Sequence, residues 1–467
     1  MSRPSTQLSA SPRTTPCPFG PVPGSRCYDV ADRRPARRQT MAAIYKTLSV
    51  PENTSPAQHG NPSKYGSASH AYHHAFHLLH LAPGPDIAVP VAASLLGLGG
   101  GRTAALLDQF VVDGLCERTV PGRFRVRPGA SLRTAAGCGD GAARRRLVDH
   151  YLHTAYQADR LIAPHHPVLS LAPAGAGCVP EELASREAAL DWLDAEFTAL
   201  VAVRAIARET GRHLSVFHLA SCLNGHFVRR GHTEEQVAQW TDAVHAAHAL
   251  GDPEAQITSH RYAGQAASRA GRHTEAVAQL SRAARIAERH GEPGPQAWTY
   301  YIFAWVEEMA GRDREAFGHA VCAAGLFRRA GEVRSEADAL NAAGWYQVRL
   351  GDLVRAKEYC TRALDIAHRH HYHGGEAAAL DSLGLLAQRA GRHDEAVASY
   401  GAALSLCRDL GNTYQEAGIL DRLGDSYTAV GRFDEARNAW EEAVDMYRLQ
   451  RRLTEAEATK QRLKKIH

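Results

Sequence analysis

The second half of the chain alternates apolar and polar positions with the period of an α-helix, in blocks of about 16 residues that end at glycine. Such a glycine ends one helix in a left-handed turn that other residues adopt only at an energetic cost. From Leu214 onward the glycines recur every 40 residues, and a second set stands halfway between. Self-similarity at this period predicts a stack of helical hairpins. The first set is Gly231, Gly271, Gly311, Gly351, Gly391 and Gly431, and the second is Gly251, Gly291, Gly331 and Gly411, with His371 and Arg451 in the remaining places.

Each turn is followed by small and capping residues that suit a closely packed hairpin. Thr274, Asp394 and Asp434 stand just after a first-set glycine, and we predict them as N-caps of the second helices. Five residues after these glycines the chain places Ala276, Ala316, Ala356, Ala396 and Ala436, and only Gln236 departs. The small alanine allows the two helices of a hairpin to pack closely.

Residues 414–447 carry most of a tetratricopeptide pattern, in Leu423, Gly424, Tyr427, Gly431, Ala436, Trp440 and Ala443. The unit is 40 residues long where about 34 is usual, and Arg448 stands where a proline usually closes the repeat. HEAT or armadillo repeats match the length better, but the Leu-Gly and Gly-x-x-x-Glu-Ala positions favour the tetratricopeptide type. The sequence therefore predicts an all-α fold, a tetratricopeptide-type solenoid of about six hairpins.

A different pattern precedes the repeats. Short helices are predicted at 75–81, 89–96 and 102–114, followed by strands at 115–119 and 123–126 around Val120-Pro121-Gly122. Helix-turn-helix plus hairpin predicts a winged helix. We therefore divide the chain into a disordered tail (1–70), a winged-helix domain (71–128), a helical connector (142–212) and the solenoid (213–467). The tail is rich in Pro, Ser, Thr, Gly and Arg, without the apolar residues that would offset its ordering entropy.

Composition excludes several classes of protein. The net charge of +4 over 467 residues does not point to a nucleic-acid or membrane partner. The nine cysteines are scattered and form no Cys-x-x-Cys pair, as expected for thiols in a reducing compartment. No apolar run has the length of a membrane span, and the N-terminus lacks the apolar core of a secretion signal. We therefore expect a cytoplasmic protein without a membrane partner.

Residues 71–467 resemble the C-terminal half of the actinobacterial SARP/AfsR-type transcription regulators, whose nucleotide switch is an NB-ARC ATPase. The likeness lies in LAPGPDIAVP, DHYLHTAYQADRLIAP, DWLDAEFTALVA and the long repeats that follow. It implies a role in a transcription-regulatory system of the secondary-metabolism type. The chain has no Gly-x-x-x-x-Gly-Lys-Ser/Thr loop, and Arg127-Pro128 stands where the family has a nucleotide-contacting His-Asp. We therefore expect the ATPase to be missing and no ATP or ADP to bind.

Other chemistry is weakly indicated. The third helix of the predicted winged helix offers Arg102 as its only base against Asp108 and Asp113, so direct DNA contact is not expected. The histidines at 70–80 and 368–373 are interpreted as polar helix faces and helix ends, because no cysteine or carboxylate cluster accompanies them. Catalytic motifs are missing, so we expect no enzyme, no cofactor and no metal.

The predicted groove of the solenoid is the candidate binding site. In tetratricopeptide folds the first helix of each unit lines the concave surface. The residues at those places are Arg261, Gln265, Trp298, Tyr301, Trp305, Glu308, Asn341, Trp345, Asp381, Asp421 and Asp425. Aromatic residues are preferred anchors at binding surfaces, although Trp298 and Tyr301 have the alternative of packing between hairpins. The sequence predicts a protein or peptide partner whose apolar side chain lies on Trp305 and Trp345 and whose basic end meets the acidic residues. Two alternatives stay open: a DNA-binding regulator acting through the winged helix, and a peptide receptor of the quorum-sensing type.

Overall fold

The computed structural model describes residues 68–132, 140–164, 166, 168–450 and 452–465. Its contacts divide the chain between Leu250 and Gly251. We call the described residues up to Leu250 the N-terminal module and those from Gly251 the C-terminal module. The tail predicted to be disordered lies outside the described residues, except for residues 68–70.

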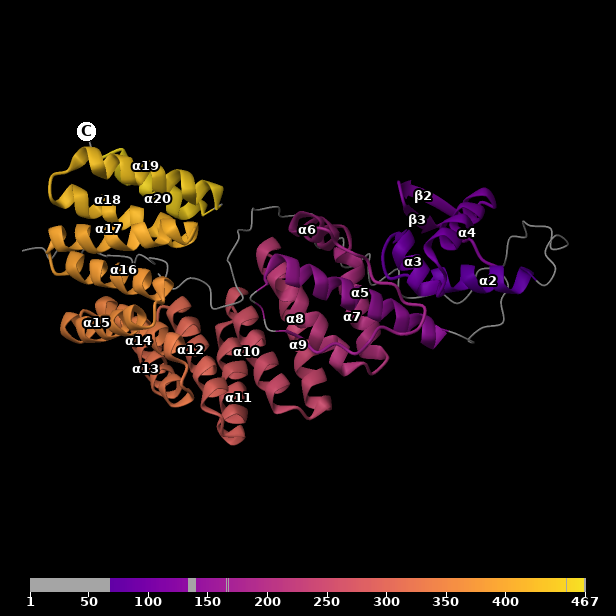
Figure 1. Cartoon of the computed structure of the whole chain (residues 1–467), viewed down its shortest axis with the longest axis horizontal. Coiled ribbons are helices and arrows are strands. Elements are labelled where there is room, and N and C mark those ends of the chain that lie inside the picture. Colours follow the sequence, from indigo (N-terminus) through magenta and orange to yellow (C-terminus); the bar gives the residue numbers. More distant parts are fainter. Residues whose placement is uncertain (1–67, 133–139, 165, 167, 451, 466–467) are drawn as a thin grey trace, which may run out of the picture. The chain divides into compact units, whose positions relative to one another are not determined.

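The N-terminal module begins with short helices and a small sheet (Figure 1). The elements are α2 (Ala68–Leu79), β1 (Ile87–Ala88), α3 (Val89–Leu96), α4 (Gly100–Val112), β2 (Cys116–Val120) and β3 (Arg123–Val126). The strands pair antiparallel in the order β1-β3-β2, with Ile87 opposite Phe124 and Cys116 opposite Val126. The three helices and two strands that the sequence predicted here are all present. The two-residue β1 was missed because it is too short to show any alternation.

Five longer helices complete this module: α5 (Asp140–Ile162), α6 (Arg186–Ala195), α7 (Phe197–Glu209), α8 (His213–Arg230) and α9 (Thr233–Leu250). One hydrophobic core runs from Phe76 of α2 through Leu147 of α5 to Phe227 of α8. Segments predicted as a winged-helix domain, a connector and the first hairpin of the solenoid therefore share a single core. The hairpin of α8 and α9 belongs to this module because α5 and α7 pack on it.

The C-terminal module is a succession of helices in which each packs on the next (Figure 1). They are α10 (Pro253–Arg269), α11 (His273–His290), α12 (Pro293–Met309), α13 (Asp313–Ala330), α14 (Val333–Leu350), α15 (Leu353–Arg369), α16 (His373–Arg389), α17 (His393–Asp409), α18 (Thr413–Ala429), α19 (Phe433–Leu449) and α20 (Leu453–Leu463). Its cores are built from alanine and single large residues such as Phe327, Tyr400 and Tyr447. The predicted all-α, tetratricopeptide-type solenoid is confirmed.

Glycine occurs at two kinds of place in these hairpins, in the turns and at close contacts between helices. At the turns it takes positive φ, as at Gly391 (φ 74°) and Gly431 (φ 78°). His371 fills a turn place with φ 48°, a conformation that favours glycine. Within the first helix the glycine of the Leu-Gly pair allows close packing, because a Cβ atom on Gly384 would lie 2.6 Å from the ring of Tyr400.

The predicted N-caps are wrong by two residues. The helices begin at His273, His393 and Phe433, so Thr274, Asp394 and Asp434 lie within the first turn. The N-cap places belong to arginines, of which Arg392 and Arg432 make no capping hydrogen bond with their side chains. The chain re-enters a helix directly after the glycine turn, which leaves no room for a longer cap. Asp394 and Asp434 still lie where the helix dipole favours a negative charge.

No single helix among the described residues is long and apolar enough to cross a membrane. The pair α3 and α4 reaches the required length and composition only together, and it is bent by 102° between the two helices.

Candidate functional site

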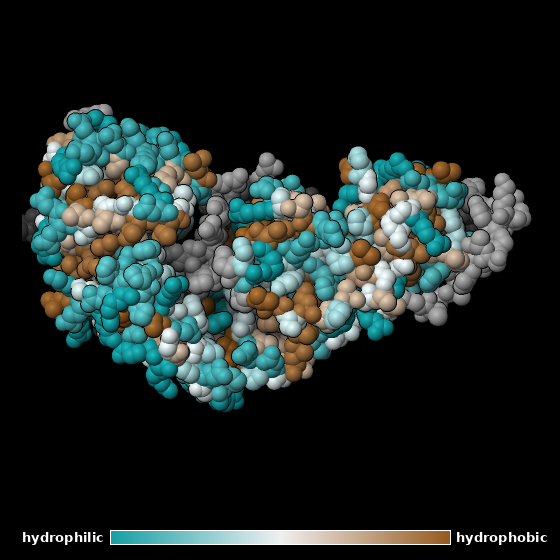
Figure 2. Space-filling model, viewed as in Figure 1, coloured by the Kyte–Doolittle hydropathy of each residue, from teal (hydrophilic) through white to brown (hydrophobic). Residues whose placement is uncertain are grey.

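The 40-residue period places the candidate residues in two rows on the first helices of the hairpins, which we call the first-helix rows. Row one is Arg261, Tyr301, Asn341, Asp381 and Asp421, on α10, α12, α14, α16 and α18. Row two, one helical turn further along each helix, is Gln265, Trp305, Trp345, Leu385 and Asp425. Residues spaced by one repeat occupy equivalent places. Figure 2 shows hydrophobic residues reaching the surface in a band over α16 and α17, between hydrophilic regions.

The aromatic residues of α12 pack against their neighbours and stay partly exposed. The ring of Trp298 meets the ring of Phe327 edge-on at 5.1 Å and that of Tyr301 at 5.9 Å. Its Nε1 donates a hydrogen bond to Glu332 at 3.1 Å. Trp305 is half-buried, with the guanidinium of Arg269 5.4 Å from its ring centre. Trp298 and Tyr301 thus make the hairpin contacts that the packing interpretation expected, whereas Trp305 is half-buried beside the core around Ile302 and Phe303.

Trp345 is a core residue, contrary to the expectation that it anchors a ligand. Its side chain is 0% exposed and belongs to the hydrophobic core around Tyr346 and Tyr400. The guanidinium of Arg422 lies 5.8 Å from its ring centre. The hairpins pack so closely at this point that the ring is covered, and a partner cannot rest on it in this conformation.

The predicted acidic end of the groove is neutralised. Asp381 is 1% exposed and accepts hydrogen bonds from Arg422 Nη2 at 2.6 and 2.7 Å and from Nε at 3.1 Å. Burial raises the pKa of Asp381, and the charge of Arg422 opposes that rise. Asp425 pairs with Arg462 at 2.7 Å, and Asp421 pairs with the same arginine.

Glu308 is paired in the same way. It accepts hydrogen bonds from the hydroxyl of Tyr346 at 3.0 Å and from Arg349 at 2.9 Å. Arginines of this chain already hold these carboxylates, so a basic ligand end would have to displace them. Arg349, Arg422 and Arg462 are the ion-pair partners that sequence reasoning missed.

Asn341 and Arg261 stand out because their polar groups are unpaired. Asn341 is 2% exposed, and neither its amide nitrogen nor its amide oxygen has a hydrogen-bond partner among the described residues. Arg261 is half-buried, its Nε is likewise unpaired there, and burial lowers the pKa of its guanidinium. Gln265, one turn after Arg261, is 3% exposed. The structure thus brings most of the predicted residues onto two rows, and Asn341 and Arg261 have polar atoms there without a partner among the described residues.

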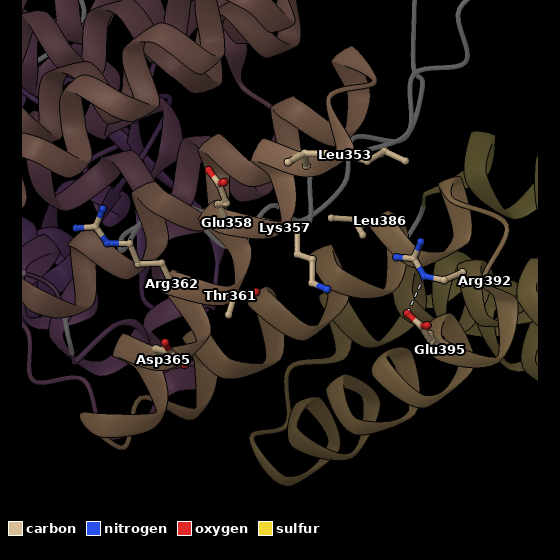
Figure 3. Close-up of a pocket in the computed structure, with 10 residues that line it drawn as sticks. Leu353, Lys357, Glu358, Thr361, Arg362, Asp365, Leu386, Arg392 and Glu395 are labelled. Atoms are coloured by element: carbon tan, nitrogen blue, oxygen red, sulfur yellow. Dashed lines mark hydrogen bonds and ion pairs between the residues drawn. The ribbon is translucent and has the colours of Figure 1, made fainter.

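A separate hollow of about 770 Å³ lies over α15, α16 and α17 (Figure 3). Leu386 is among its lining residues, and residues of both charges surround it, including Lys357, Asp365 and Arg392. Arg392 is paired with Glu395 at 2.8 Å. None of its described lining residues belongs to the first-helix rows. Its charges are balanced and its lining residues are mostly exposed, so the hollow gives no indication of ligand chemistry. Its residues can therefore serve as control positions in experiments on the first-helix rows.

One group of described residues has metal-ligand geometry. Glu254, His290 and Glu292 bring one ligand atom each within 4.8 Å of one another, at the exposed junction of α10, α11 and α12. Exposed acidic groups are common without a cation, and nothing else at this place points to one.

The last repeats match a family model, and about a third of the chain is similar to curated regulatory proteins. Residues 335–409 and 375–449 match the family model of the tetratricopeptide repeat. Regulatory protein AfsR of Streptomyces griseus is 37% identical over 152 residues, and its counterpart in Streptomyces coelicolor is 34% identical over 155 residues. Each match covers 30% of this chain and 15% of the relative, so the chain spans only a small part of these relatives.

Among solved structures, a signal transduction ATPase with numerous domains from Pyrococcus horikoshii, which has a tetratricopeptide repeat sensor, is 13% identical with a TM-score of 0.43. That match covers 90% of this chain and 63% of the other chain.

Proposed function

We propose that the chain binds a protein or an extended peptide on the first-helix rows of its C-terminal module, and that it acts without catalysis in a regulatory system. The observation that carries this proposal is the unpaired amide of Asn341. A buried amide without hydrogen bonds costs about 1–3 kcal/mol. Asn341 is 2% exposed, so a ligand reaches the amide only when the surrounding side chains move, and the bonds that it then supplies recover this free energy.

The places equivalent to Asn341 in the next two hairpins hold paired carboxylates. Asp381 and Asp421 pair with arginines that follow them by 41 residues. Asn341 has Ser382 at that spacing, and the Oγ of Ser382 is also 0% exposed and unpaired among the described residues. A hydroxyl and a carboxamide thus replace an ion pair, and both lack partners. A peptide group offers one donor and one acceptor, which matches a carboxamide.

Apolar contact would come from the neighbouring hairpin. Trp305 lies one repeat before the buried Trp345 and is itself only half-buried. Aromatic residues at such places commonly contribute about 2 kcal/mol or more to binding. In the proposed complex the concave groove of the solenoid contains both the aromatic ring and the free amide.

The regulatory role rests on the likeness to AfsR. The order helix, strand, helix, helix, strand, strand in the N-terminal module is compatible with the predicted winged helix and with the resemblance to regulators of secondary metabolism. A peptide receptor of the quorum-sensing type would use the same rows and differ only in taking a free peptide. We do not propose a DNA-binding function, since Arg118 pairs with Asp108 and Arg125 with Glu117 on the hairpin.

Photocross-linking tests the proposed surface. A benzoyl-phenylalanine replaces Trp305 in one variant of the full chain and Lys357, in the hollow over α15 to α17, in the control. We expect the first variant to cross-link a discrete partner in its host, with Asn341→Ala weakening that partner's affinity about tenfold. Cross-linking from position 357 with none from position 305 would exclude the first-helix rows as the site.

A further inference from the structure

A buried glutamate recurs at the start of three successive first helices. The residues are Glu336 on α14, Glu376 on α16 and Glu416 on α18. Each carboxylate lies within hydrogen-bond distance of a side chain eight residues earlier, at the end of the preceding second helix. The partners are Nε of Arg328 at 2.8 Å, Nδ1 of His368 at 3.1 Å and Nε of Arg408 at 2.7 Å. The middle hairpin therefore has a histidine where its neighbours have an arginine.

A second histidine completes the surroundings of Glu376. Nδ1 of His373 lies 3.1 Å from its other carboxylate oxygen, and no arginine or lysine among the described residues pairs with it. Burial raises the pKa of Glu376, and the hydrogen bonds and charges of His373 and His368 lower it by more. The carboxylate is therefore ionised at neutral pH and depends on two imidazoles.

Histidine and arginine hold a carboxylate differently, because only histidine changes its charge near neutral pH. A guanidinium stays charged, whereas an imidazole gains its proton between about pH 8 and pH 5. Protonated imidazoles attract Glu376 as cations, and neutral ones offer it a single N–H each. The contact is therefore stronger at pH 6 than at pH 8, and the stability that it gives to this turn falls as the pH rises.

A second titratable pair at the same turn acts in the same direction. The hydroxyl of Tyr372, the residue before α16, donates a hydrogen bond to Asp338 of α14 at 3.1 Å, and the guanidinium of Arg334 lies 5.6 Å from its ring centre. Burial raises the pKa of Asp338 to about 7, against the effect of this hydrogen bond. In an unfolded chain this pKa is about 3.9, so the stabilisation by protonated Asp338 is lost as the pH rises from there towards 7.

The charged groups of the adjoining helices have other partners or are exposed. Arg362 of α15 pairs with Glu336, Arg408 of α17 pairs with Glu416 and Glu442, and Asp365, Arg369, His370 and His371 are exposed.

The backbone of this turn is strained. His371 takes φ 48° and is the one residue other than glycine with a positive φ in the part of the chain that the structure describes. Gly374 and Gly375 follow in the first turn of α16, where glycine weakens a helix. Side-chain contacts therefore have to hold a turn whose backbone favours opening.

We infer that the turn between α15 and α16 (residues 368–376) is a pH-sensitive joint of the solenoid, held closed when His368 and His373 are protonated and opening more readily when they are neutral. The inference goes beyond the proposed function, since it requires no ligand. It adds a response to pH in α16, the helix that carries Asp381 of the first-helix rows.

Backbone hydrogen exchange of the full chain at pH 6 and pH 8, corrected for the intrinsic exchange rate, tests the joint. Asp338→Asn is the reference chain, because its remaining pH dependence at this turn belongs to the histidines. Protection at the start of α16 should be about threefold greater at pH 6 than at pH 8, the size expected of an exposed ion pair. Adding His368→Arg and His373→Asn should abolish the difference.

A matched pair of substitutions transfers the joint to the next hairpin. Arg408→His with Thr413→His places histidines at the equivalent positions around Glu416 and should create a similar pH dependence at the start of α18. Equal protection at both pH values in the reference chain would overturn the inference. A difference that persists after His368→Arg and His373→Asn, or no new difference at α18, would show that these histidines do not control the turn and would overturn it as well.

Discussion

Arg422 stabilises the last hairpins by neutralising a carboxylate that is almost wholly buried. Arg422→Ala leaves Asp381 charged, 1% exposed and without its only described partner. Breaking such a pair costs about 3–5 kcal/mol, and we expect that loss in urea unfolding. The double variant Asp381→Leu/Arg422→Met removes both charges and should recover most of the lost free energy of unfolding. A double variant as unstable as the single one would show that packing of Arg422 against Trp345, rather than charge, is the larger contribution.

His226 makes the stability of the N-terminal module depend on pH. It is 3% exposed, and burial lowers the pKa of its ring to about 4, partly offset by Asp194. The unfolded chain takes up this proton near pH 6.5, so unfolding is favoured by acid between these two values. The stabilisation is present above pH 6.5 and is lost as the pH falls towards 4, by about 3 kcal/mol in total.

Urea unfolding at pH 7 and pH 5, followed for the wild type and His226→Leu, measures this contribution. The wild type should lose more stability than the variant over that interval. Equal losses would mean that His226 does not titrate in the interval.

The ion pairs between successive hairpins have a signal in the sequence. Glu308 and Arg349, Asp381 and Arg422, and Asp421 and Arg462 are each separated by 41 residues, one repeat and one residue. An acid on a first helix with an arginine at that spacing therefore indicates an ion pair between successive hairpins. The burial of Trp345 had no such signal, because the half-buried Trp305 occupies the same place one repeat earlier. The difference comes from packing among three hairpins, which the local pattern does not contain.

At the scale of the element, two glycines on neighbouring helices are expected to respond to alanine in opposite ways. A Cβ atom on Gly384 in α16 would lie 2.6 Å from the ring of Tyr400, and overpacking of this kind costs about 1–3 kcal/mol. Gly401 in α17 has no heavy atom within 4 Å of such a Cβ, so Gly401→Ala should stabilise the helix by about 0.5–1 kcal/mol. Thermal unfolding of the two variants gives the comparison. Destabilisation by both would show that α17 is packed more closely than described.

The helices were predicted well because glycine and alanine recur at fixed places, and those places follow from chain geometry. His371 shows the strength of that rule, since it adopts the left-handed turn of the glycine it replaces. The N-caps were placed wrongly because capping depends on where the chain re-enters the helix, which no side chain in the turn determines. The exposed surface of Trp305 and the unpaired amide of Asn341 emerge only from the assembled hairpins.

At the scale of the whole molecule, the core decides which elements belong together. The hairpin of α8 and α9 has the repeat spacing of the solenoid, yet its apolar residues Leu219, Leu223 and Phe227 lie in the core of the N-terminal module. A sequence period identifies hairpins but does not say which neighbours cover them. The C-terminal module has cores of its own, and the first-helix rows from Arg261 to Asp425 lie within it.

The central claim is that the first-helix rows bind an extended peptide, and hydrogen exchange tests it most directly. Backbone exchange of the full chain is compared with and without a saturating peptide that the wild-type chain selects from a displayed random library. The account predicts slower exchange on α10, α12 and α14, with α15 and α17 unchanged, and loss of this protection in Asn341→Ala. Protection confined to α15 and α17, around Lys357, would contradict it.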